Sequence, residues 1–278
     1  MAVVNSEYAD FANANNNVIV KTTVEGSDTY TCPNFVLTDA NDLYLPLDFT
    51  ATSVTYTRTF ANNDFNALYL PFGVAVNQLT DCSVYAINMF HQSEGEEGTI
   101  NLFLEVLKAK DTDNTLANHP YMVKYSGDTE TPATFTFTGV SVTKTPETAS
   151  VFKCSSMYYD FTFQGIYNKM ENASSVYALG KDDTTGETAL INPKNGLNAQ
   201  RWYMTMTERE SQFNGASKAK VVFSIIGGGD GETTGVHELE NTNGECECFT
   251  IDGRRTTNAA KGLKIKRIKN GKTVKQFN

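Results

Sequence analysis

The side chains that could perform acid–base or metal chemistry are scattered along this chain. Its three histidines lie near turn-forming residues, and none has a partner at the spacing of a metal site. They are His91, His119 and His237. Glu94, Glu96 and Glu97 form a glycine-flanked acidic run that is typical of a solvated loop tip. No combination of nucleophile, base and orienting group is recognisable, so the sequence predicts no catalytic residue.

One loop is rich in oxygen ligands. Within Lys110–Thr115, the side chains of Asp111, Asp113 and Asn114 could face a common cation. Calcium takes about six to eight oxygen ligands, and the glycine and distal glutamate of an EF-hand are absent here. We therefore predict that the chain holds no cofactor, and calcium at these three residues is the alternative.

Aromatic residues are the other candidates for ligand binding, because aromatic rings can stack on sugar rings. The candidate platform comprises Trp202, Tyr203, Tyr158 and Tyr159, with Tyr167 nearby in sequence. Alternation along a strand places Trp202 and Tyr203 on opposite faces, so one of them is expected in the core. Core packing is the competing role for each of these rings.

Short segments that alternate apolar and polar residues recur along the chain and predict strands. The predicted strands are 17–22, 28–37, 53–60, 134–142, 158–164, 176–180, 201–207 and 220–226, and we also favour a strand at 101–110. Gly139 is predicted to mark a bulge or a bend. This pattern, with little helix, predicts an all-β fold with a β-sandwich or jelly-roll-like body.

The charge of the chain is unevenly distributed. Nine basic residues and no acidic residue lie within Gly253–Asn278, so the net charge of −9 leaves −18 on the rest. An acidic body argues against nucleic acid as the main ligand. Asn270-Gly271 between two apolar-alternating segments is a strong hairpin signal. We therefore predict a small C-terminal β-hairpin tail that either is solvated or packs on the body.

These observations suggest four regions. Residues 1–31 are an N-terminal extension or first strands, and residues 32–226 are the sandwich body, with two subdomains divided near 144–150 as an alternative. Residues 227–248 are a linker, because Gly227–Gly231 is a flexible break. Residues 249–278 are the β tail.

The cysteine pattern and the hydropathy bear on the state of the thiols and on membrane or export segments. The five cysteines show no metal-type spacing, and their odd number favours buried free thiols. They are Cys32, Cys82, Cys154, Cys246 and Cys248. No apolar run is long enough for a transmembrane helix, and the first residues lack the pattern of a signal peptide.

Several segments carry a resemblance to a known group. The body segments are Asn34–Asp39, Ser53–Phe60, Ala67–Phe72, Val176–Gly180 and Ala199–Tyr203. Together they resemble a β-rich module found near the C-termini of exported proteins of gut and oral Bacteroidetes. Phe249–Arg255, Lys261–Leu263 and Lys269–Lys272 resemble the C-terminal sorting domains recognised by type IX secretion.

The resemblance implies an extracellular or bacterial cell-surface protein whose tail engages the export machinery. We therefore expect a non-enzymatic binding or structural module whose partner is a glycan or another surface protein. Two alternatives stay open, namely a carbohydrate-binding or glycan-active accessory domain and a pilus-like assembling subunit whose edge strands pair with a neighbour.

Overall fold

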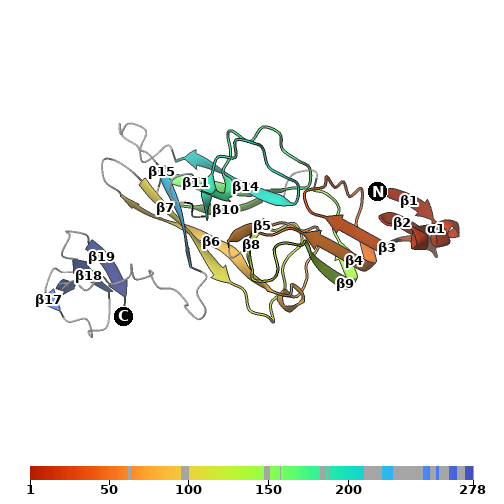
Figure 1. Cartoon of the computed structure of the whole chain (residues 1–278), viewed down its shortest axis with the longest axis horizontal. Coiled ribbons are helices and arrows are strands. Elements are labelled where there is room, and N and C mark those ends of the chain that lie inside the picture. Colours follow the sequence, from red (N-terminus) through yellow and green to blue (C-terminus); the bar gives the residue numbers. More distant parts are fainter. Residues whose placement is uncertain are drawn as a thin grey trace. The chain divides into compact units, whose positions relative to one another are not determined.

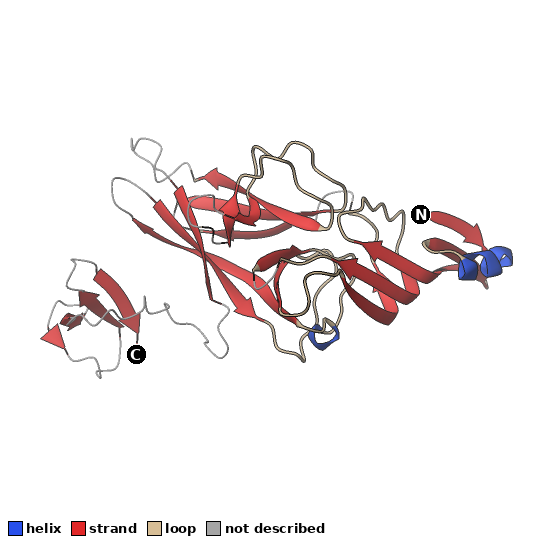
Figure 2. Cartoon of the chain, viewed as in Figure 1, coloured by secondary structure: helices blue, strands red, loops and turns tan. Residues whose placement is uncertain are grey.

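The computed structural model shows a protein made almost entirely of strands. It describes residues 1–61, 64–94, 100–146, 151–156, 158–181, 186, 188–209 and 221–227, and the strand residues 247–250, 255–256, 263–267 and 273–277. Strands account for 57% of the chain and helices for 6% (Figure 2). The predicted all-β, sandwich-like fold is therefore confirmed.

The chain divides into two compact units, unit 1 at Met1–Gly228 and unit 2 at Gly229–Asn278. The division falls inside the glycine-rich segment where the sequence suggested a boundary. Of residues 144–150, where the sequence suggested a possible division of the body, 147–150 lie outside the described residues.

Unit 1 contains three main sheets and one hairpin. The N-terminal sheet has the order β1-β2-β3-β4-β9 and comprises β1 (Ala2–Asn5), β2 (Val18–Val24), β3 (Ser27–Thr38), β4 (Phe49–Arg58) and β9 (Ala133–Val142). The central sheet has the order β15-β7-β6-β8-β5 and comprises β15 (Val221–Gly227), β7 (Ile100–Lys108), β6 (Cys82–Glu94), β8 (Tyr121–Tyr125) and β5 (Phe65–Leu68). The outer sheet comprises β10 (Val151–Ser155), β11 (Tyr159–Ile166) and β14 (Arg201–Glu208). The hairpin comprises β12 (Ala178–Lys181) and β13 (Thr188–Ile191).

The few helices are short. They are η1 (Ser6–Tyr8), α1 (Ala9–Ala14) and η2 (Val76–Gln78). The sequence predicted no helix at α1, whose turn places Ala12 against Val18 and Val20 in a small N-terminal core. Among the described residues, no helix has the length and apolar character that crossing a membrane requires.

The central sheet separates two hydrophobic cores. Neighbouring residues of its strands alternate between them, as strand geometry requires. Val84 and Val123 face core 1, which the central sheet shares with the N-terminal sheet. Tyr85 and Met122 face core 2, which it shares with the outer sheet. Residues of β5, β6 and β8 are thus buried on both faces of the central sheet. Figure 1 shows where these strands lie.

The N-terminal sheet contains an irregularity that runs across three strands. In β9 the buried positions are Phe135 and Phe137 and then Val140 and Val142, so the alternation shifts by one residue at Gly139. Gly139 has φ of +64°, which confirms the bend predicted there. The same shift occurs in β4 and β3, where the buried series are Ala51, Val54, Tyr56 and Cys32, Phe35, Leu37.

The three shifts lie at one level of the sheet. The pairing of β3 with β4 has the same register on both sides of Pro33, and that of β4 with β9 has the same register on both sides of Thr52. Pro33 has no N–H to donate. Because the register is preserved, the three strands shift together and keep their large side chains in core 1. We call this the aligned shift.

Unit 2 is a small antiparallel sheet in the order β17-β16-β18-β19. Its strands are β16 (Glu247–Thr250), β17 (Arg255–Thr256), β18 (Leu263–Arg267) and β19 (Thr273–Phe277). The strands predicted on either side of Asn270-Gly271 exist and pair antiparallel, from Leu263 opposite Phe277 to Arg267 opposite Thr273. The turn between them lies outside the described residues.

The three described thiols are free. Cys32 is fully buried, as predicted, whereas Cys82 and Cys154 are half-buried. Burial raises the pKa of Cys32 to about 11, of Cys82 to about 12 and of Cys154 to about 11. Such thiols are protonated and weakly nucleophilic at neutral pH.

Candidate functional site: a buried charged cluster between the sheets

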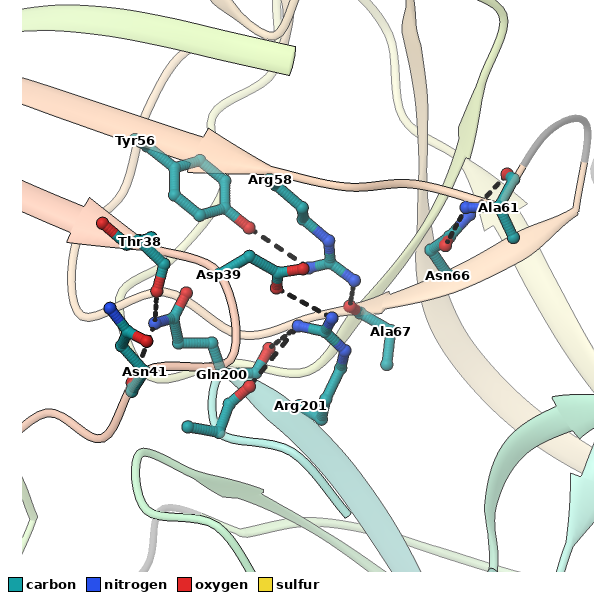
Figure 3. A network of polar contacts seen from close by, with 11 residues as sticks. Thr38, Asp39, Asn41, Tyr56, Arg58, Ala61, Asn66, Ala67, Gln200 and Arg201 are labelled. Atoms are coloured by element: carbon teal, nitrogen blue, oxygen red, sulfur yellow. Dashed lines mark hydrogen bonds and ion pairs between the residues drawn. The ribbon is translucent and has the colours of Figure 1, made fainter. Parts of the chain in front are cut away.

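Charged and polar side chains from the N-terminal and outer sheets meet inside unit 1 (Figure 3). We call this group the junction cluster, and its members are Asp39, Tyr56, Arg58, Gln200 and Arg201. Tyr56 and Arg58 lie at the end of β4, and Asp39 follows the end of β3. Arg201 begins β14 of the outer sheet, and Gln200 precedes it. The cluster therefore forms where the ends of strands from separate sheets converge.

Arg58 is the centre of the cluster and is only 1% exposed. Its guanidinium donates a hydrogen bond from Nη1 to the Tyr56 hydroxyl at 3.2 Å and another from Nη2 to the Ala67 carbonyl at 2.5 Å. Ala67 belongs to β5, so the second bond ties the N-terminal sheet to the central sheet. The guanidinium also lies 4.9 Å from the centre of the Phe60 ring, a cation–π contact.

Arg201 supplies the second buried positive charge. Its Nη2 lies 2.8 Å from Oδ1 of Asp39, and both side chains are at most 17% exposed. Burial lowers the pKa of Arg201, and the nearby charge of Arg58 lowers it further, while Asp39 opposes the shift. Asp39 thus forms an ion pair with Arg201, whereas the hydrogen bonds of Arg58 go to Tyr56 and Ala67.

The same environment acts on Tyr56. Burial raises the pKa of its hydroxyl, and the adjacent Arg58 opposes the rise. The hydroxyl therefore stays protonated, accepts the Arg58 hydrogen bond and does not serve as a base.

Gln200 joins the outer sheet to the N-terminal sheet. Its Nε2 donates to the Thr38 carbonyl at 2.7 Å and to the Asn41 carbonyl at 3.2 Å. Its backbone has φ of 60°, a left-handed conformation that is uncommon for glutamine. The side chain is fully buried, so these contacts hold the residue in this conformation.

Three buried atoms of the cluster make no hydrogen bond with any residue that the structure describes. They are Asp39 Oδ1, Arg58 Nε and Gln200 Oε1. Asp39 Oδ1 is nevertheless 2.8 Å from an Arg201 nitrogen, so that contact is an ion pair whose angle falls outside hydrogen-bond geometry. The cluster therefore carries a desolvation cost that its direct bonds offset only in part.

The geometry assigns the junction cluster a positioning role. Its central side chain and Gln200 are buried, and the bonds that they donate end on backbone carbonyls or on a neighbouring hydroxyl. Such contacts fix the angles between the sheets.

The structure overturns part of the predicted aromatic platform. Trp202 is 0% exposed and donates from Nε1 to the Tyr121 carbonyl of β8 at 2.7 Å. Tyr159 is 2% exposed and lies in core 2. Both rings face inward because alternation places them on the face of the outer sheet that packs against the central sheet. They are core residues and cannot stack on a sugar in this conformation.

The other aromatic candidates lie closer to the surface. Tyr203 is half-buried on the opposite face of β14 from Trp202, as alternation predicted, and stands opposite Gln164 of β11. Burial raises the pKa of Tyr203. Tyr158 is half-buried and packs against core 2. The structure therefore separates the predicted platform into inward and outward rings. Tyr167 is also buried, and its hydroxyl donates to Asn118 Oδ1 at 2.5 Å.

The candidate calcium loop is a closed turn. Oδ2 of Asp113 accepts a hydrogen bond from the Lys110 amide at 2.8 Å, and the Asp113 carbonyl accepts one from Val76 at 2.9 Å. Asp111, Asp113 and Asn114 are exposed. In the part of the chain that the structure describes, no group of three or more His, Cys, Asp or Glu side chains could hold a metal. Calcium binding here stays a prediction.

The described histidines and Glu94 do not form a common site. His91 lies on β6 and its Nε2 is 3.1 Å from Glu105 Oε2, while His119 packs edge-on against Tyr121 and Phe152. Burial lowers the pKa of His119. Glu94 ends β6 instead of lying in a loop, because β6 extends along β7 to this residue. His237, Glu96 and Glu97 lie outside the described residues.

The sequence did carry a signal for the junction cluster. Arg58 occupies the apolar side of the alternation Val54, Tyr56, Arg58, Phe60. An arginine at a core position demands buried partners. Asp39, Gln200 and Arg201 gave no comparable signal, because their partners are distant in sequence.

The chain was compared with known protein families, curated proteins and solved structures. No protein-family model, curated protein or solved structure matches this chain.

Proposed function

We propose that this chain is a non-catalytic structural module, exported to the cell surface, in which unit 1 is a rigid spacer between its own first and last strands. The junction cluster is the observation that carries the proposal. Its buried charged and polar side chains bind across sheets. Arg58 binds Ala67, Arg201 binds Asp39 and Gln200 binds Thr38.

Two further features support a spacer. The strand β1 lies at one end of unit 1, and β7 and β15 lie toward the opposite end (Figure 1). The central sheet belongs to both cores, so neither core can be lost without disturbing the other. The resemblance of residues 249–278 to sorting domains supports export.

Pulling on the two termini of the full chain tests the spacer. We expect unit 1 to unfold in a single event that releases about 800 Å of chain, at roughly 3.5 Å for each of residues 1–228. Unit 2 unfolds in a separate, shorter event. Force spectroscopy measures the lengths, and stepwise release of unit 1 in two comparable parts would contradict the proposal.

Antibody labelling tests the location. An antibody raised against unit 1 is expected to label intact cells of the source organism, and removal of residues 249–278 is expected to abolish the labelling while the protein accumulates inside. Permeabilised cells are the control for expression. Labelling that requires permeabilisation of cells making the full chain would refute surface exposure.

A further inference from the structure

The last strand of unit 1 occupies the edge of the central sheet. β15 pairs with β7, from Val221 opposite Ile100 to Gly227 opposite Val106. This pairing is parallel, whereas the other pairings of the central sheet are antiparallel. The strand before β15 in the chain, β14, belongs to the outer sheet, so β15 joins a different sheet from its predecessor.

The edge of β7 requires a covering strand. Its residues Ile100, Leu102, Leu104 and Val106 are at most 5% exposed and belong to core 2. β6 pairs with one edge of β7 and β15 with the other, so removing β15 would expose a row of unpaired N–H and C=O groups that can accept another strand. β7 is thus a preformed acceptor for a parallel strand.

β15 is the end strand of the central sheet and pairs with β7 on one side. Ile225 packs against core 2 but is only half-buried, as is Ile226. Among the described residues, β15 has no strand partner except β7. An edge strand that is paired on one side only opens at a lower free energy than strands paired on both sides.

The composition of β15 favours pairing. Its sequence, VVFSIIG, contains no charged residue and no proline. Natural edge strands usually carry such residues, which prevent pairing with other chains. Short uncharged segments rich in β-branched and aromatic residues are those that pair readily between molecules.

We propose that the β15 strand is exchangeable, so that β7 of one copy of this chain accepts β15 from a second copy. The exchanged strand makes the same registered pairs, so the sheet loses no bond, and protein concentration shifts the balance between free and joined copies. When each of two copies donates β15 to the other, the result is a closed dimer. The inference goes beyond the spacer function, because a monomeric chain would still be a spacer.

Thiol cross-linking between two populations of the full chain tests the exchange. Phe103 and Ser224 are direct register partners, and neighbouring strands lie about 4.8 Å apart, within the span of a disulfide. One population carries Phe103→Cys and the other, with a different tag, carries Ser224→Cys. Both carry Cys246→Ser and Cys248→Ser. Oxidised glutathione accepts the two electrons when the bond forms.

The matched control replaces Ser224→Cys with Thr207→Cys, an exposed position on the outer sheet. We expect about tenfold more disulfide-linked heterodimer from the 103–224 mixture than from the control mixture, because pairing raises the local thiol concentration. Circular dichroism checks that each variant is folded. Native mass spectrometry of the unmodified chain is expected to show dimers that increase with concentration. Heterodimer at the control level, or an unmodified chain that stays monomeric at every concentration, would overturn the proposal.

Discussion

Replacing Trp202 with alanine is expected to lower the free energy of unfolding of unit 1 by about 3–5 kcal/mol, because removing a large buried ring leaves a cavity. The ring is fully buried in core 2, 5.4 Å from the Phe163 ring centre. Its N–H also binds the Tyr121 carbonyl across the two sheets. Both the cavity and the orphaned carbonyl contribute to the loss. Urea unfolding followed by far-ultraviolet circular dichroism measures it.

Two variants separate these contributions. Trp202→Phe keeps an aromatic ring but removes the donor, so we expect about 1–3 kcal/mol of destabilisation from the unpaired carbonyl and the smaller ring. Tyr203→Ala, on the opposite face of the same strand, is the matched control and should cost less because Tyr203 is half-buried. Equal losses for Trp202→Ala and Tyr203→Ala would show that Trp202 does not anchor core 2. The chain has one tryptophan, so native emission at short wavelength independently checks its burial.

Replacing Arg58 with alanine is expected to cost about 3–5 kcal/mol, since breaking a buried charged network is strongly destabilising. The change leaves the Tyr56 hydroxyl and the Ala67 carbonyl without their donor. It also relieves the repulsion between Arg58 and Arg201, which offsets part of the loss. Chemical unfolding gives the net value.

Lysine at position 58 tests the geometry of the contact. It keeps the charge but lacks the planar fork that reaches Tyr56 and Ala67 together, so Arg58→Lys should recover only part of the stability. Arg209→Ala is the control, because Arg209 forms a 3.6 Å ion pair with Asp160 in which both side chains are about half-exposed. Such surface pairs contribute about 0–1 kcal/mol. A loss for Arg58→Ala no larger than that for Arg209→Ala would contradict a positioning role.

Much of the strand content could be predicted from alternation. Segments 53–60, 134–142 and 201–207 lie within strands β4, β9 and β14 or extend them by one or two residues. Strands buried on both faces were harder to predict. β8 presents Met122 and Val123 to different cores, so the alternation of apolar and polar residues that predicts a strand is missing there. The sequence therefore predicted no strand at 121–125.

The pairing of strands could not be predicted from local pattern. β3 pairs with β4 and β15 with β7 in parallel, and parallel pairing depends on crossovers whose geometry is global. For the same reason the junction cluster was not foreseen, since Asp39 and Arg201 meet only after separate sheets have packed. Alternation placed Trp202 and Tyr203 on opposite faces but could not tell which face is internal.

The aligned shift constrains how this protein can tolerate insertions and deletions. Deleting one residue from a single strand, for instance Thr52, would turn half of that strand's core side chains toward solvent, because its neighbours would keep their shift. The lengths of the three strands at Pro33, Thr52 and Gly139 are therefore coupled, even though none of these residues is a large core residue. We expect related sequences to lose or keep all three together. A change of length in β3, β4 or β9 is thus expected to require matching changes in the other two strands.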